Sequence, residues 1–120
     1  MTDNRFAVED RPAESRYVLI DAGEGSGPTR EAGQEVYADL VRESGTERIF
    51  YHTAVSDDYA GQGLASVLVR GAVEHAVSLG YSVVPVCPYV VDWFKKHPDY
   101  VEHEVTATPE HLRAVSERQG

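Results

Sequence analysis

Three side chains in the middle of the chain could carry out proton transfer or nucleophilic attack. His52 lies in an apolar run that leads into a glycine-rich loop, and an imidazole that titrates near neutral pH could accept a proton there. Cys87 is the single cysteine, and a thiol at the start of a helix could carry a transferred group transiently. Tyr89 could donate a proton or cover a ligand with its ring. Each also has a structural interpretation: a hydrogen-bonded core histidine, a small buried hydrophobic residue and a contact residue.

A second candidate for chemistry is the loop Gly61-Gln62-Gly63-Leu64-Ala65-Ser66, between a predicted strand and a predicted helix. Backbone N–H groups at a helix N-terminus bind anions, and small residues let a phosphate approach them. One glycine suffices for an ordinary strand-to-helix turn, so two glycines around Gln62 favour a ligand loop. A P-loop would need a lysine after Gly63, and a Rossmann loop would need a third glycine and a later acidic residue. Neither motif fits.

The elements that must position these groups follow from hydrophobic alternation. We expect strands over residues 16–21, 35–42, 47–55 and 82–87, with full pairing of the last strand opposed by Pro85. A strand, a helix and a strand in this order imply a right-handed crossover. The third and fourth predicted strands should therefore run parallel within an otherwise antiparallel sheet of one layer.

Three helices are expected. A polar stripe at four-residue spacing predicts a helix from Leu64 that ends near Gly80. A short helix should span residues 89–96, because Pro98 follows. After Thr108 we expect a peripheral or frayed helix that has only Leu112 and Val115 to bury.

Composition narrows the class of protein. The 120 residues are 42% hydrophobic and 26% charged, which is typical of one globular domain. A formal net charge of -9 repels a phosphate backbone and argues against nucleic acid as a partner. The first ten residues lack a signal peptide core, no apolar run approaches the roughly 20 residues of a membrane span, and one cysteine cannot form an internal disulfide. We therefore predict a cytoplasmic protein without membrane contact.

The distribution of charged and apolar residues along the chain predicts the domain organisation. We expect a loose N-terminal tail over residues 1–15, one folded domain over 16–101 and a peripheral C-terminal segment over 102–120. The five histidines show no ligand spacing with cysteine or carboxylates, so no metal site is predicted.

The glycine loop resembles the pyrophosphate loop of the GNAT superfamily of acyl-CoA N-acyltransferases, which is written R/Q-x-x-G-x-G/A. Gly63 and Ala65 match its last two fixed positions, whereas Ala60 stands where the family has Arg or Gln. The chain is also similar to a small, minimal GNAT-like subgroup through residues 50–55, 61–66, 84–90 and 97–100. This resemblance implies an α/β fold with a mixed, mostly antiparallel sheet, one parallel splayed strand pair and packed helices.

The resemblance implies acetyl-CoA as the cofactor. In this family the parallel strands flanking the loop and helix splay apart, and the pantetheine arm pairs with the freed backbone as an added strand. A patch formed by Lys95, Lys96 and His97 could neutralise the cofactor phosphates. The cofactor-binding residues carried over are Thr53, Ala54, Val55, Gly61, Gln62, Gly63, Leu64, Ala65, Ser66, Val86, Cys87, Tyr89, Lys95 and Lys96.

The implied reaction is N-acetyl transfer to an amine, with the thioester near His52, Cys87 and Tyr89. Two routes stay open: direct attack by the amine, or an acyl-Cys87 intermediate. The acidic charge favours a cationic acceptor, either a small molecule or a protein lysine. A long loop replaces the helices that often build the acceptor site, which suits a large substrate or completion by a second copy in a homodimer. The alternative function is a non-catalytic CoA-binding module that acts as a sensor or interaction subunit.

Overall fold

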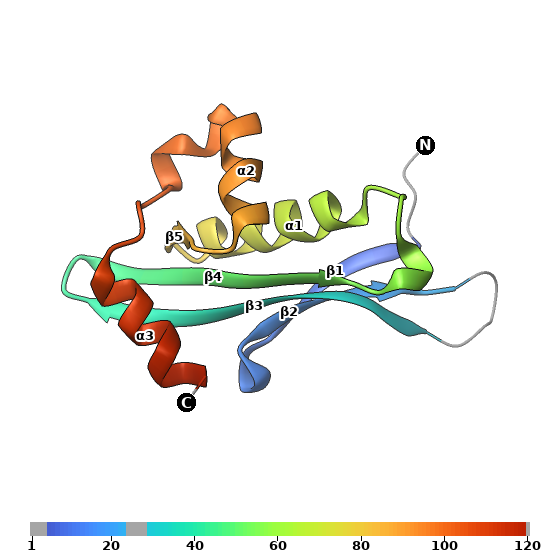
Figure 1. Cartoon of the computed structure of the whole chain (residues 1–120), viewed down its shortest axis with the longest axis horizontal. Coiled ribbons are helices and arrows are strands. Elements are labelled where there is room, and N and C mark those ends of the chain that lie inside the picture. Colours follow the sequence, from blue (N-terminus) through green and yellow to red (C-terminus); the bar gives the residue numbers. More distant parts are fainter. Residues whose placement is uncertain (1–4, 24–28, 120) are drawn as a thin grey trace.

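Five strands form one mixed sheet in the order β1-β2-β3-β4-β5 (Figure 1). The computed structural model describes residues 5–23 and 29–119. The first four strands pair antiparallel, and β5 pairs parallel with β4, as predicted. The strands are β1 (Phe6–Arg11), β2 (Arg16–Asp21), β3 (Arg30–Arg42), β4 (Gly45–Val55) and β5 (Ser82–Pro85).

The predicted strand boundaries are partly wrong. β3 begins at Arg30 rather than at residue 35, and it continues the pairing with β2 down to Asp21. β5 ends at Pro85, two residues earlier than predicted, because the chain after that proline turns into a helix. Residues 24–28, in the connection between β2 and β3, lie outside the described residues.

The prediction of a loose tail is wrong for residues 6–14. β1 pairs with β2 along its whole length, from Phe6 opposite Asp21 to Arg11 opposite Arg16, and a short 3₁₀ turn follows. Val8 packs so closely on Gly71 that a Cβ at that glycine would lie 2.7 Å from it. The error arose because this edge strand carries many charged residues, which hide the alternation that identifies a strand.

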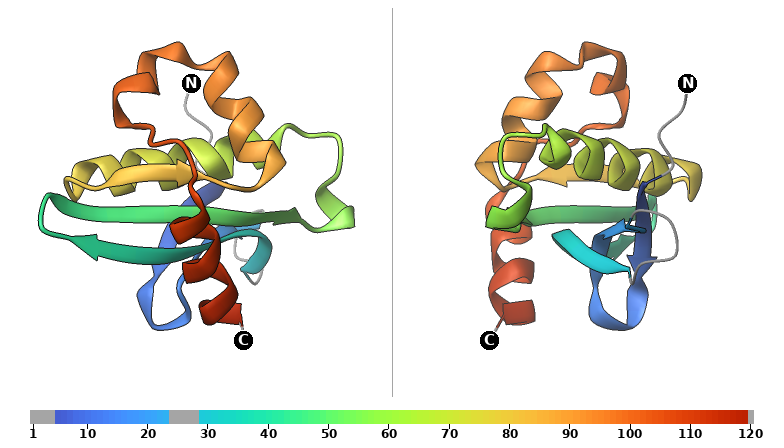
Figure 2. Two further views of the ribbon diagram at one scale, coloured as in Figure 1. Left: turned by 60° about the vertical axis from the view of Figure 1, so that its left-hand side comes forward. Right: turned by 90° about the vertical axis from the view of Figure 1, so that its right-hand side faces the viewer.

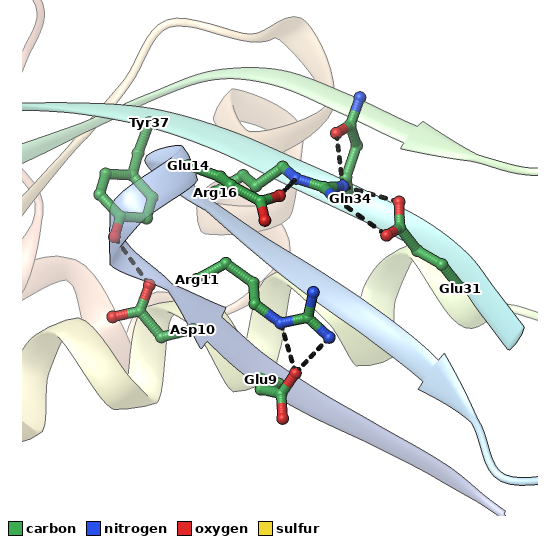
Figure 3. A network of polar contacts seen from close by, with 8 residues as sticks. All are labelled: Glu9, Asp10, Arg11, Glu14, Arg16, Glu31, Gln34 and Tyr37. Atoms are coloured by element: carbon green, nitrogen blue, oxygen red, sulfur yellow. Dashed lines mark hydrogen bonds and ion pairs between the residues drawn. The ribbon is translucent and has the colours of Figure 1, made fainter. Parts of the chain in front are cut away.

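Polar contacts also hold β1 and its turn against the sheet (Figure 3). The Tyr37 hydroxyl donates to Asp10 at 2.7 Å. Arg16 donates to Glu14 at 2.7 Å and to Glu31 at 2.6 Å, and so connects the turn to β3. The contacts of Asp10 with Tyr37 and of Arg16 with Glu31 are long-range in sequence, which is why the pattern of residues 1–15 alone could not predict them.

The strands form a single sheet, as predicted, and helices cover both of its faces, so the molecule has three layers (Figure 2). On one face lie α1 (Leu64–Ser78) and α2 (Pro88–Lys96), and on the other lies α3 (Pro109–Gln119). The core under α1 includes Leu68, Val69, Ala72, Val73 and Ala76, each 0% exposed. None of the helices in the described part of the chain has the length and apolarity to cross a bilayer.

Of the two residues that the C-terminal helix was predicted to bury, only one is buried. Val115 faces the sheet, but Leu112 is 52% exposed and His111 is buried in its place. A buried imidazole needs partners at both nitrogens. His111 has them: its Nδ1 accepts from the Thr108 N–H at 2.9 Å, and its Nε2 lies 2.8 Å from Glu47. Side-chain pairing across 64 residues therefore decided which face of α3 turns inward.

Candidate functional site

The parallel strands β4 and β5 separate halfway along β4. They pair from Glu47 opposite Ser82 to Phe50 opposite Pro85. Beyond that point the N–H groups of Val86 and Cys87 both donate to the Phe50 carbonyl, at 3.0 and 3.1 Å, and the chain turns into α2. Within the described ranges, no strand pairs with residues 51–55 on this side (Figure 1). The second half of β4 therefore presents an open edge to an extended ligand.

The glycine loop begins where this open edge ends. Gly61 and Gly63 have φ values of +80° and +71°, and a Cβ at either one would meet nothing within 4 Å. No side chain caps the N-terminus of α1 at Gly63. In the part of the chain that the structure describes, the loop N–H groups of residues 61–63 donate no backbone hydrogen bond. Together with the first N–H groups of the helix, they can hold an anion.

The chain just before this loop is held in place by buried polar contacts. Tyr59 is 5% exposed, and its hydroxyl donates to Asp21 in β2 at 2.6 Å. The Arg5 guanidinium, the Tyr59 hydroxyl and the Gly23 N–H together keep the pKa of the Asp21 carboxyl well below its usual range. Arg30 donates to Asp58 at 2.8 Å in the same turn. These contacts fix the direction in which the loop leaves β4.

A pocket of about 220 Å³ lies between the start of α1 and one side of α2. Trp93 stacks on His97 at its base, with ring centroids 4.1 Å apart. Burial raises the pKa of Tyr89, and a hydrogen bond with Ser66 opposes that shift. The predicted residue Lys95 is exposed and does not line the pocket. The lining residues are Ser66, Tyr89, Asp92, Trp93, Lys96 and His97.

A hollow of about 250 Å³ lies at the far end of the open edge. Residues 31–34 of β3 and residues 54–56, at and just after the end of β4, line it. Gly33 contributes no side chain, and a Cβ there would lie 2.8 Å from the Ala54 carbonyl oxygen. The predicted contact residues Ala54 and Val55 thus belong to a concave surface as well as to the edge.

Three side chains, one each from β3, β4 and the junction of β5 with α2, meet on the α1 side of the sheet. Cys87, at the junction of β5 and α2, donates its S–H to the Thr53 hydroxyl at 3.3 Å. Thr53 in turn donates to Glu35 Oε1 in β3. Glu35 is 0% exposed. Its second oxygen, Oε2, has no hydrogen-bond partner among the described residues.

The environment of Glu35 disfavours its charge. Burial raises the pKa of the Glu35 carboxyl well above its ordinary value, and the neighbouring Cys87 adds to that shift. The hydrogen bond from Thr53 and the His52 backbone amide oppose it. A carboxyl with this balance exchanges a proton at a higher pH than an ordinary glutamate does.

The predicted site residues do not all come together. Cys87 meets Thr53, and Tyr89 meets Ser66. His52 is exposed, and because successive side chains of a strand alternate, it points to the face opposite Thr53. His52 and Cys87 therefore flank the open edge of β4 from opposite sides.

Sequence reasoning missed Glu35. The signal that could have found it is its position two residues before Tyr37, which assigns both side chains to the same face of β3. Tyr37 is buried, so the alternation predicts a buried carboxyl at Glu35. No group of three or more His, Cys, Asp or Glu side chains in residues 5–23 and 29–119 is arranged to hold a metal ion.

Comparisons with known proteins give one matching family model and solved structures of similar fold. A family model described as GCN5-related N-acetyl-transferase matches residues 26–103, more than half of the chain. The NMR solution structure of a GCN5-like candidate N-acetyltransferase from Staphylococcus aureus superposes with a TM-score of 0.58 at 21% identity, over 91% of this chain and 97% of that one. This likeness establishes the fold. An aminoglycoside acetyltransferase from an uncultured soil metagenomic sample, crystallised with trehalose, has a TM-score of 0.49 at 17% identity, over 78% and 68% of the two chains.

Proposed function

The chain belongs to the GCN5-related N-acetyltransferase family, and on that premise we propose that it transfers the acetyl group of acetyl-CoA to an amine. The open edge of β4 beside the loop Gly61–Ser66 is the observation that carries this proposal. An extended chain of amides, such as pantetheine, can pair with an unpaired strand edge. The N–H groups that follow it can hold the pyrophosphate. Both parts of the cofactor are thus met by one continuous segment.

The pocket beside α2 supports the same mode of binding. Ser66, Tyr89 and Lys96 line it next to the loop, so a phosphate at the helix N-terminus has a cation and a hydroxyl within the same wall. Lys95 adds charge from the exposed surface, which offsets the net charge of -9 locally. The N–H groups of Val86 and Cys87 already donate to Phe50, so these two residues contact the cofactor through their side chains.

The reaction needs three events around the thioester. A neutral amine attacks the carbonyl carbon, a donor binds the developing oxyanion, and the carbon–sulfur bond to CoA breaks. The N–H groups of β4 beyond Phe50 that point away from β3 provide the oxyanion donor. In the direct route His52 takes the amine proton from the exposed face, and Tyr89 donates a proton to the departing CoA thiolate. In the covalent route Cys87 carries the acetyl group between the two substrates.

The acceptor is a cationic amine, either a small molecule or a protein lysine. Excess negative charge attracts such an acceptor to the protein. The hollow formed by residues 31–34 and 54–56 is open and lies at the same edge of β4. An amine that enters there approaches the thioester from beside Ala54.

Binding is tested by thermal unfolding with and without CoA. Ligand at about 100 times its dissociation constant should add about 2.7 kcal/mol to the free energy of unfolding. Gly63→Ala should weaken this stabilisation, because the added methyl group stands where an anion approaches the loop. Gly45→Ala is the matched control, since Gly45 also has a positive φ and open space but is the first residue of β4, next to the β3–β4 turn. An unshifted melt for the wild type would contradict the proposal.

Turnover is tested by thiol release from acetyl-CoA over a panel of diamines, polyamines and lysine peptides. Release that depends on the amine supports the enzyme. Binding of CoA without release over the whole panel favours the CoA-binding module instead. Intact mass after exposure to acetyl-CoA, compared with Cys87→Ser, separates the covalent route from the direct one.

A further inference from the structure

The buried carboxyl of Glu35 is not used by the reaction as described above. Deepening the proposed function, on which it rests, we propose that Glu35 accepts, through the Thr53 hydroxyl, the proton that Cys87 releases when its sulfur attacks a thioester. Glu35 touches no substrate, because it is 0% exposed. It is therefore a positioning residue that acts on the reacting sulfur only through Thr53.

The direction of the hydrogen bonds carries the argument. Cys87 donates to Thr53, and Thr53 donates to Glu35, so the chain runs from the thiol to the carboxylate without a break. A hydroxyl can accept one proton while it gives up another. Transfer along this chain breaks the S–H bond, exchanges the Thr53 proton and forms an O–H bond at Glu35. No group has to move more than a hydrogen-bond length.

The unpartnered oxygen argues against a purely structural role. A buried carboxylate that serves stability has its oxygens satisfied by donors. Glu35 Oε2 has no partner among the residues that the structure describes. This leaves the ionised form incompletely stabilised and makes the carboxylate a better proton acceptor.

The raised pKa of Glu35 also favours proton transfer from Cys87 to Glu35. An ordinary glutamate has a pKa of about 4.3 and a free cysteine about 8.5, so the transfer is normally unfavourable by about four powers of ten. Burial raises the pKa of Glu35 well above its ordinary value and so narrows that gap. Two titratable side chains face Glu35: Cys87, and Tyr17, which is the residue opposite Glu35 on β2. The Tyr17 hydroxyl forms hydrogen bonds with His75 and Arg48.

With this proton transfer, every bond and proton in the two acyl-transfer steps is accounted for. The Cys87 sulfur bonds to the acetyl carbon, the bond from that carbon to the CoA sulfur breaks, and the CoA thiolate takes a proton from solvent. Glu35 holds the Cys87 proton. When the amine attacks the acetyl-Cys87 carbonyl, the Cys87 sulfur leaves and regains this proton through Thr53. The amine proton passes to solvent, and the protein returns to its starting state.

The test is the rate of Cys87 alkylation by iodoacetamide as a function of pH, in which iodide leaves and the thiol proton is lost. We compare the wild type with Glu35→Gln, which keeps the shape, and with Thr53→Val, which removes the hydroxyl. Positioned bases contribute about 10²- to 10⁴-fold, so both variants should react at least about tenfold more slowly near neutral pH. Thr53→Ser keeps the hydroxyl and should stay within about twofold of the wild type. The differences should shrink as the pH rises and the thiol ionises without help.

A Glu35→Gln protein that reacts as fast as the wild type near neutral pH, or faster, overturns the proposal, because the carboxylate would then only repel the thiolate. If that variant does not fold, the Thr53→Val and Thr53→Ser pair gives the same decision. Iodoacetamide needs neither CoA nor an amine. The test therefore distinguishes loss of the proton transfer from Cys87 to Glu35 from loss of acetyltransferase activity. If the proton transfer is absent, direct attack by the amine on acetyl-CoA is still possible.

Discussion

Two buried polar clusters lie along β4, one on each half, and they differ in how completely their groups are paired. In the half that pairs with β5, Arg48 is 4% exposed and donates to Asp39 at 2.7 and 2.8 Å and to the Tyr17 hydroxyl at 2.8 Å. The Tyr37 ring lies 3.9 Å from its guanidinium carbon. In the splayed half, Glu35 has a partner for one oxygen and, within the described residues, none for the other.

The difference separates a structural cluster from a reactive one. Burial opposes the charge of Arg48, but Asp39 and Tyr17 outweigh that effect, so its pKa lies above its usual range. Burial also raises the pKa of Tyr17 to about 12, and the hydroxyl stays neutral at physiological pH. The Arg48 cluster therefore keeps its protonation state, whereas the environment of Glu35 moves its titration toward neutral pH.

Breaking the paired cluster should have the largest effect. Arg48→Gln leaves the partly exposed Asp39 carboxylate and the buried Tyr17 hydroxyl without their Arg48 donors, and the loss of one partner of a buried polar group costs about 1 to 3 kcal/mol. Urea unfolding should show this loss with an unchanged m-value. Arg70 is the matched control: it also lies over aromatic rings but is exposed, so Arg70→Gln should change stability by less than about 0.5 kcal/mol. A similar loss of stability in Arg48→Gln and Arg70→Gln would show that the buried contacts of Arg48 contribute no more than an exposed arginine does.

Neutralising the other cluster should have the opposite sign. A carboxyl with a raised folded pKa contributes full stability below its unfolded pKa and loses it as the pH rises through the folded pKa. Glu35→Gln should therefore match the wild type in stability near pH 4 and be more stable than the wild type near pH 8. Urea midpoints at both pH values measure this. A variant that is less stable than the wild type near pH 8 would show that the ionised carboxylate stabilises the fold.

The smallest predicted effect is the coupling between Thr53 and Glu35. Near pH 8, Thr53→Val removes the donor to Glu35 Oε1 and should destabilise the protein by about 1 to 2 kcal/mol. In a Glu35→Gln background the same change should cost less, with a coupling energy of about 1 kcal/mol in a double-mutant cycle. A coupling near zero would mean that the two side chains do not act as a unit.

Much of the fold could be predicted because it depends on local pattern. The helix that starts after Gly63, the parallel strand pair and the termination at Gly80 each follow from a few neighbouring residues. The polar edge strand β1 could not be predicted, because its partners lie elsewhere in the sequence. The same holds for His111, which is buried on account of Glu47, 64 residues away.

For the candidate site, the sequence by itself determined the two glycines of the loop before α1 and the proline in the short strand β5, because backbone freedom at glycine and the missing N–H of proline act locally. Only the tertiary structure decided which side chains meet. A register shift between Val36 and Tyr37 inserts one extra residue in β4, and this sets Glu35 opposite Thr53. A one-residue change in pairing moves a side chain to the other face of a sheet. The proton chain to Cys87 is therefore a property of strand register, which no local pattern encodes.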